Sequence, residues 1–116
     1  MRALGEEAFL IVHIVEKKVW EEAKQAGEYC AASLATEGFI HSSRPEQVLG
    51  VANRFYRGVA DLLLLWIDPQ RLLAPLRFEA SDGELFPHIY GPLNLDSVIR
   101  VCKLAPDADG VYRILN

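Results

Sequence analysis

Three histidines, His13, His41 and His88, are the residues of this 116-residue chain with the widest chemical capacity. An imidazole can exchange a proton near neutral pH, donate or accept a hydrogen bond, or bind a metal ion. The three lie far apart in the sequence, so a shared role requires a fold that brings their elements together. We expect all three to line one functional cleft, and each is a candidate catalytic residue.

His13 lies in an apolar segment, Phe9 to Val15, whose length and β-branched content are typical of a strand buried on both faces. Because strand side chains alternate, His13 shares a face with Ile11 and Val15 and points into an apolar layer. Burial disfavours the charged imidazole, so His13 is expected to be neutral. Two interpretations stay open: a ligand-binding histidine, and a core histidine whose ring is satisfied by a backbone carbonyl.

His41 stands near the end of a short predicted strand, directly before a predicted helix. Ligands often meet chain ends and helix N-termini at such places. Ser42 and Ser43 add two hydroxyl groups to the same position. We therefore treat His41, Ser42 and Ser43 as candidate ligand-binding residues.

The residues after His41 also match the start of a helix. In Ser43-Arg44-Pro45-Glu46, Ser43 fits the N-cap and Glu46 can reach back to its amide as in a capping box, while Pro45 suits the first turn. Pro45 removes an amide donor and Glu46 adds negative charge, which disfavours a phosphate site. Stabilising the helix start is thus the alternative role of Ser43 and Glu46.

His88 lies in a segment rich in aromatic residues and prolines. Together with Tyr90 it could stack on a flat ring such as a nucleobase or nicotinamide; the alternative is a rigid loop whose aromatic rings fill the core. Glu84, which follows a Ser81-Asp82-Gly83 turn, is the nearest carboxylate that could pair with a histidine or polarise a ribose hydroxyl. Its alternative is a solvated acid at a turn.

Three histidines and a glutamate could in principle bind a catalytic zinc ion, which needs three protein ligands and an open position. The sequence contains no H-E-x-x-H or H-x-H, and every possible ligand comes from a different element, so we expect no metal. It also lacks the G-x-G-x-x-G, P-loop and G-x-S-x-G motifs. Cys30 and Cys102 form no recognisable metal or disulfide spacing, which favours reduced thiols.

The hydrophobic pattern predicts a single α+β domain, residues 1–116, with two main helices. One helix starts at Glu16 and ends at Gly27, and the other follows Ser43 and ends near Gly58. The predicted strands are Phe9–Val15, as a central strand, then Phe39–Ser42, Asp61–Ile67, Leu76–Glu79, Val98–Leu104 and a short or frayed Val111–Leu115. Tyr29–Gly38 is predicted to wrap the surface as a loop, and Glu84–Pro92 to form a shaped loop beside an edge strand.

Composition narrows the class of partner. A net charge of −4 and a pI near 5.3 argue against a broad nucleic-acid or anionic-lipid surface, which leaves a small-molecule or nucleotide ligand, or an RNA terminus. The segment Ala8–Val15 lacks a signal-peptide cleavage site, and no run approaches the roughly 20 apolar residues of a membrane span. We expect a cytoplasmic protein with no membrane partner; its oligomeric state stays open.

Several segments together resemble one uncharacterised bacterial family, domain-of-unknown-function family 952. The resemblance runs from about Leu10 to Leu104. The segments that carry it are Val12-His13-Ile14, Gly38-Phe39-Ile40-His41-Ser42-Ser43, the helix from Glu46 to Tyr56, and Leu85-Phe86-Pro87-His88-Ile89-Tyr90-Gly91-Pro92-Leu93.

That family is more distantly similar to the ADP-ribosyltransferase superfamily, including its RNA 2′-phosphotransferase branch. The resemblance implies a split, mostly antiparallel sheet that grips NAD, with His13 orienting the nicotinamide-side ribose and His41 beside the nicotinamide. Either Glu84 or His88 would take the third position, where a glutamate commonly supports an oxocarbenium-like ribosyl centre.

The implied ligand-binding set is His13, His41, Ser42, Ser43 and Tyr90. Transfer of an ADP-ribosyl or phosphate group is one function that this resemblance implies. The alternative is a non-catalytic module that binds a small molecule or a protein.

Overall fold

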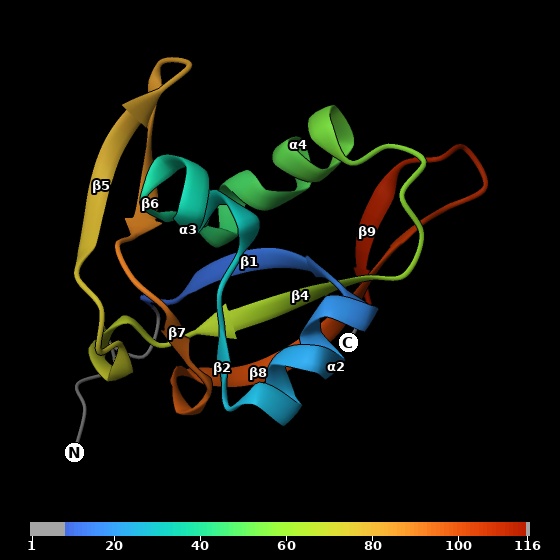
Figure 1. Ribbon diagram of the computed structural model, residues 1–116. Coiled ribbons are helices and arrows are strands. Elements are labelled where there is room, and N and C mark those ends of the chain that lie inside the picture. Colours follow the sequence, from blue (N-terminus) through green and yellow to red (C-terminus); the bar gives the residue numbers. More distant parts are fainter. Residues whose placement is uncertain (1–8, 116) are drawn as a thin grey trace.

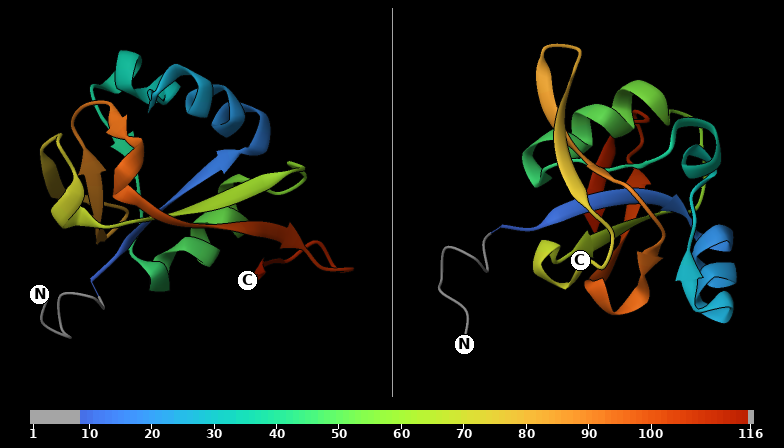
Figure 2. Two further views of the ribbon diagram at one scale, coloured as in Figure 1. Left: turned by 90° about the horizontal axis from the view of Figure 1, so that it is seen from below. Right: turned by 60° about the vertical axis from the view of Figure 1, so that its left-hand side comes forward.

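The computed structural model describes residues 9–115, and the fold is organised around strand β1, Ile11–Glu16 (Figure 1). Both faces of β1 are buried, so its alternating side chains supply two hydrophobic cores. Ile11 and Val15 belong to one core, with helix α2 (Lys17–Ala26). Val12 and Ile14 belong to the other, with helix α4 (Pro45–Phe55). The two helices therefore cover opposite faces of the sheet that contains β1, as Figure 2 shows.

That sheet has four antiparallel strands in the order β1-β4-β8-β9. The three strands beside β1 are β4 (Leu62–Ile67), β8 (Val98–Pro106) and β9 (Tyr112–Leu115). The prediction of a central first strand was wrong, because β1 pairs only with β4 within the sheet. Its outer edge meets Ser43 instead, and the backbones of Val12 and Ser43 exchange two hydrogen bonds of 2.8 Å each.

A second, three-stranded sheet stands beside the first in the order β3-β6-β5 (Figure 1). It contains β3 (Ile40–His41), β5 (Leu76–Ser81) and β6 (Glu84–Ile89). The β5–β6 hairpin turns at Asp82 and Gly83, which both have positive φ angles, of 50° and 82°. This is the type I′ geometry that matches the twist of a hairpin, so the predicted tight turn is confirmed.

The segment predicted as a shaped loop contains the middle strand of this sheet, β6. Pro87 lacks an amide proton, a feature that by itself predicts an irregular backbone. Its missing donor falls on the side of the short strand β3, where the Pro87 carbonyl still accepts a hydrogen bond of 3.1 Å from the Ser42 amide. One proline is therefore compatible with a paired strand here.

The two main helices are confirmed, with corrections at both ends of α4, which ends at Phe55 with Tyr56 as its C-cap and not near Gly58. Gly27 ends α2 at a φ of 90°, as expected of a left-handed cap. Helix α4 has Arg44, not Ser43, as its N-cap, and the Gln47 side chain, not Glu46, accepts from the Arg44 amide at 2.9 Å. Ser43 cannot cap because its backbone is engaged with β1.

The predicted surface loop from Tyr29 to Gly38 also contains regular structure. It holds part of strand β2 (Glu28–Tyr29), which pairs with β7 (Leu93–Asn94), and a third helix, α3 (Ala32–Glu37). Short 3₁₀ turns, η1 (Pro69–Arg71) and η2 (Leu95–Ser97), complete the described elements. The protein is a single α+β domain with mostly antiparallel sheets. No helix within residues 9–115 is long and apolar enough to cross a membrane.

Candidate functional site

A cleft of about 510 Å³ opens between strand β1, the three-stranded sheet and helix α4. All three histidines contribute to its wall, so the fold brings together the residues that the sequence singled out. The residues that line the cleft are Val12, His13, Ile14, His41, Ser42, Ser43, Val51, Phe55, Tyr56, Ser81, Asp82, Phe86 and His88. The histidines reach this cleft in three different environments.

Both ring nitrogens of His13 are bonded inside the protein. Nδ1 lies 2.5 Å from the His41 carbonyl oxygen, and Nε2 lies 2.7 Å from the Tyr29 hydroxyl. Because a carbonyl only accepts, Nδ1 must carry the proton, and Nε2 accepts from Tyr29. Burial lowers the pKa of His13 from 6.5 to about 4, so the ring is neutral at neutral pH. His13 therefore fixes β3 and β2 against β1.

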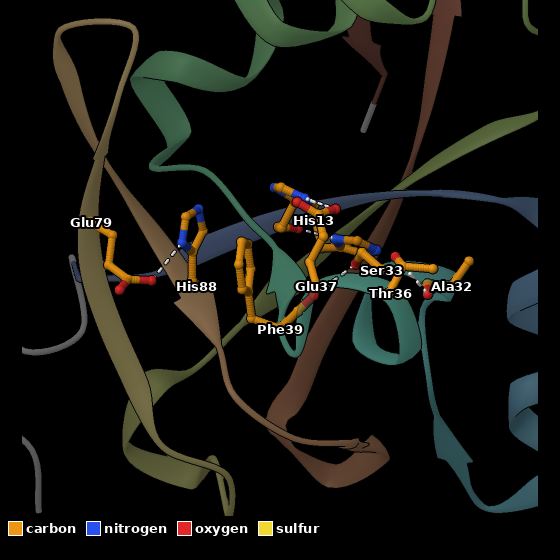
Figure 3. Close-up of polar contacts among 9 residues, drawn as sticks. His13, Ala32, Ser33, Thr36, Glu37, Phe39, Glu79 and His88 are labelled. Atoms are coloured by element: carbon orange, nitrogen blue, oxygen red, sulfur yellow. Dashed lines mark hydrogen bonds and ion pairs between the residues drawn. The ribbon is translucent and has the colours of Figure 1, made fainter.

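His88 pairs with a carboxylate that the sequence analysis did not single out. Its Nδ1 lies 2.8 Å from Oε1 of Glu79, which also accepts a hydrogen bond of 2.5 Å from the Tyr90 hydroxyl. These hydrogen bonds, from Tyr90 first and then His88, lower the pKa of Glu79. Figure 3 shows the pair, with the second ring nitrogen of His88 on the edge away from Glu79. The Arg77 guanidinium lies over the Tyr90 ring at 5.0 Å.

Aromatic stacking fixes the plane of the His88 ring. The Phe39 ring lies nearly parallel to it, with centroids 4.0 Å apart and an interplanar angle of 18°. His41 lies directly opposite His88 across the β3–β6 pair, and their rings meet edge to face at 5.4 Å. Such contacts leave the buried imidazole little rotational freedom.

His41 differs from His88 in facing solvent. Its side chain is 55% exposed, and its Nε2 lies 2.9 Å from Oε2 of Glu37, at the end of α3. Its backbone carbonyl is the acceptor for His13. Exposed ion pairs of this kind contribute about 0–1 kcal/mol, so the pair holds the rim of the cleft only loosely.

The two serines are both held by backbone hydrogen bonds, and they differ in the state of the Ser42 hydroxyl. Ser43 joins β1 through its backbone, and Ser42 donates its amide to Pro87. The Ser42 hydroxyl is buried and has no hydrogen-bond partner within residues 9–115. Buried hydroxyl groups are normally satisfied, so this one has an unused hydrogen-bonding capacity in a residue that lines the cleft.

Glu84 and Tyr90 do not line the cleft. Glu84 begins β6 at the hairpin end, where Gln47 donates to it at 3.1 Å. Tyr90 contacts two neighbours of the cleft residue His88: its hydroxyl donates to Glu79, and its ring lies 5.3 Å from that of Phe39. Of the two candidates for the third position, His88 is the one in the cleft wall.

The sequence did not single out four neighbours of the histidines: Tyr29, Glu37, Phe39 and Glu79. The turn at Asp82-Gly83 carries a usable signal for Glu79. In the hairpin that this turn closes, Ser81 lies opposite Glu84 and Glu79 lies opposite Phe86. Glu79 is therefore a diagonal neighbour of His88 on the same face of the sheet. No comparable signal exists for Tyr29, which reaches His13 from a separate two-stranded ladder.

The cleft carries little positive charge. Among the lining residues within the described range 9–115, Asp82 is acidic and none is lysine or arginine. Asp82 pairs with Arg54 at 3.5 Å. Phe55, Tyr56 and Phe86 supply aromatic surface. Within residues 9–115 no three His, Cys, Asp or Glu side chains gather closely enough to hold a metal ion. The lining therefore suits an uncharged or cationic ring with hydroxyl groups.

Comparison with known proteins supplies a family but no activity. The chain resembles the protein CC0527 from Caulobacter crescentus. Its crystal structure is 39% identical with a TM-score of 0.83, over 90% of this chain and 94% of that one. Its solution NMR structure is 40% identical with a TM-score of 0.76, over 88% and 90%. No curated protein matches the chain. The model of a family described as a protein of unknown function, DUF952, matches residues 14–101. The chain belongs to the DUF952 family.

Proposed function

We propose that the cleft binds NAD or a related nucleotide and that the nicotinamide–ribose end enters first. The main support for this proposal is that two polar groups of residues lining the cleft form no hydrogen bond with the described protein, while aromatic side chains form part of the wall. The Ser42 hydroxyl and the Nε2 atom of His88 have no protein partner within residues 9–115. Polar groups placed in a largely apolar cleft are the usual means of orienting a small ligand.

The size of the cleft supports a ligand of this kind. Small-molecule sites typically enclose roughly 300–1,000 Å³, and this cleft encloses about 510 Å³. Ribose hydroxyls can donate to His88 Nε2 and pair with Ser42. Phe55, Tyr56 and Phe86 offer ring faces on which a flat nicotinamide or base can stack.

The charge of the lining indicates which end of NAD is inserted. The nicotinamide ring of oxidised NAD is a pyridinium cation, which suits the aromatic surface and Asp82. The pyrophosphate needs cations, and no lysine or arginine among the described residues lines the cleft. It is expected at the mouth, near Arg54, which stands beside Asp82. ADP-ribose without nicotinamide should consequently bind more weakly than NAD.

The similarity of the sequence motifs to the ADP-ribosyltransferase superfamily also supports the proposal, since that resemblance implies a split sheet around NAD. The individual roles change, however. Both nitrogens of His13 are used inside the protein, so ribose contacts pass to Ser42 and His88. Transfer of an ADP-ribosyl or phosphate group to an acceptor, an RNA end included, follows from the same resemblance.

A non-catalytic binding module is the second candidate function. It is favoured by the position of Glu84, because the carboxylate expected in the third position lies outside the cleft wall. A module of this kind would bind the nucleotide and release it unchanged.

A titration tests the binding. NAD, nicotinamide riboside, ADP-ribose and AMP are added separately to the labelled protein at up to millimolar concentration, about the weakest useful affinity, while amide and imidazole NMR signals are followed. NAD and nicotinamide riboside should shift the signals of Ser42 and His88, and Ser42→Ala should weaken both about tenfold. Absence of any shift at Ser42 and His88 with all four compounds would rule out the proposal.

A further inference from the structure

We propose that His88 is a general base, that Glu79 positions it, and that the pair lets the cleft cleave its bound nucleotide with water. This inference rests on the proposed function, because it assigns a reaction to the same cleft. A binding module needs a hydrogen-bond acceptor, but it does not need an acceptor backed by a carboxylate. The arrangement around His88 is that of a proton-transfer group.

The hydrogen bond to Glu79 fixes the tautomer of His88. An ionised carboxylate only accepts, so Nδ1 carries the proton and Nε2 keeps its lone pair. Nε2 has no partner within residues 9–115, and His88 lines the cleft. The free lone pair is therefore on the edge of the ring away from Glu79 (Figure 3).

The surroundings hold this imidazole still. His88 is only 7% exposed, and Phe39 stacks on its face at 4.0 Å. Tyr90 donates to the same Glu79 oxygen, so the carboxylate is itself held in place. A carboxylate that orients an imidazole and stabilises its protonated form is the second half of a general-base pair. Glu79 does not line the cleft and acts through His88 as a positioning residue.

The reaction that this geometry supports is hydrolysis of the bond between nicotinamide and ribose. The oxygen of a water molecule bonds to C1′ of the ribose while the C1′–N bond breaks. The electron pair of that bond stays on the ring nitrogen, which turns the pyridinium cation into neutral nicotinamide. The proton of the attacking water passes to Nε2 of His88, where Glu79 stabilises the imidazolium, and then to solvent. The products are ADP-ribose, nicotinamide and one proton.

The Glu37–His41 pair provides a matched control. It has the same two residue types at nearly the same distance, 2.9 Å against 2.8 Å, but it faces solvent. Release of nicotinamide from NAD is measured for the wild type and for Glu79→Gln, His88→Gln and Glu37→Gln. His88→Gln should lose about a hundredfold or more in kcat. Glu79→Gln should lose about tenfold with KM unchanged within about twofold, and Glu37→Gln should match the wild type.

The outcomes separate the two proposals. Binding of NAD without nicotinamide release overturns the general-base assignment and leaves the binding proposal standing. Absence of both binding and release overturns both. Release that Glu79→Gln leaves unchanged overturns the positioning role of Glu79.

A spectroscopic measurement distinguishes positioning from a purely structural role, and it needs no ligand. The ¹⁵N signals of the His88 ring should show a protonated Nδ1 and an unprotonated Nε2 in the wild type. An amide can present either an oxygen or an NH₂ group, so Glu79→Gln should mix the two tautomers, while Glu37→Gln should leave His88 unchanged. A wild-type His88 that carries its proton on Nε2 would overturn the proposal, as would a tautomer insensitive to Glu79→Gln.

Discussion

His13 and His88 are equally buried, each 7% exposed, yet the regions that hold them use the imidazole in opposite ways. In the region between β1, β2 and β3, both ring nitrogens of His13 form hydrogen bonds, Nε2 with the Tyr29 hydroxyl and Nδ1 with the His41 carbonyl. In the three-stranded sheet, Nδ1 of His88 bonds to Glu79, and Nε2 has no partner in the described part of the chain. Burial by itself therefore does not distinguish the two histidines; the number of ring nitrogens engaged within the protein does.

The two histidines also differ in whether a carboxylate lies beside the ring. Within residues 9–115 no carboxylate bonds to His13, and desolvation dominates, so its pKa falls to about 4. His88 has the carboxylate of Glu79 at 2.8 Å from its Nδ1. The first region holds a neutral imidazole that ties strands together, and the second holds an imidazole paired with a carboxylate. The following substitutions test this contrast.

The largest expected effect is the loss of stability on replacing His13. His13→Ala leaves the Tyr29 hydroxyl and the His41 carbonyl without their partner and opens a cavity, which should cost about 4 kcal/mol. His88→Ala should cost about 2 kcal/mol, because Glu79 keeps Tyr90 and is partly solvated. Urea unfolding at neutral pH measures both. Equal losses of unfolding free energy in the two variants would contradict the predicted difference between His13 and His88.

The next effect is the pH dependence of stability. The pKa of His13 is lowered in the folded state, so between 6.5 and about 4 the unfolded chain binds more protons. Stability therefore rises with pH across this window and is lost as pH falls through it. At about 1.4 kcal/mol per pKa unit, the contribution reaches about 3 kcal/mol.

Urea unfolding of wild type and His13→Gln at pH values from 7 to 4 isolates this contribution. The free-energy gap between the two proteins should shrink as the pH falls, since the variant has no imidazole to protonate at this position. A gap that stays constant over the whole range would show that His13 is not held neutral.

A smaller effect is expected from removing single hydroxyl groups. Tyr29→Phe leaves the Nε2 atom of His13 without a donor in a buried site and should cost about 1–2 kcal/mol. Tyr90→Phe, the matched change in the other region, should cost less than Tyr29→Phe, because Glu79 keeps its hydrogen bond with His88 and faces solvent in part. Thermal unfolding of the two variants side by side gives the comparison, and the reverse order would refute it.

The smallest effect is expected at the exposed pair. Glu37→Gln should change the free energy of unfolding by less than about 0.5 kcal/mol, since both side chains of the pair are about half exposed. Urea unfolding at low and at physiological salt provides the measurement. A loss above about 1 kcal/mol would mean that His41 has a structural role comparable to that of His13.

Local patterns in the sequence predicted the elements that local physics controls. Gly27 ends α2 because a left-handed residue is needed there. The Asp82-Gly83 turn forms because both positions need positive φ angles. The apolar run of β4 (Leu62–Ile67) became a buried strand, as its composition indicated.

The errors arose where a distant strand competed with a local signal. Ser43 has the right type for an N-cap, but pairing with β1 takes its backbone, and the helix starts one residue later. The prolines around His88 suggested a loop, but β5 on one side and β3 on the other give this segment enough partners to be a strand. Pairing between distant segments contributes more than one local preference.

The sequence by itself determined the α+β class, the two main helices, the hairpin turn and the three histidines as the residues to follow. Only the tertiary structure decided what each histidine can do. What an imidazole can do depends on which of its nitrogens are already hydrogen-bonded. The partners in question, Tyr29 for His13 and Glu79 for His88, come from other elements of the fold. No spacing along the chain encodes that pairing, because it depends on which strands meet and in which register.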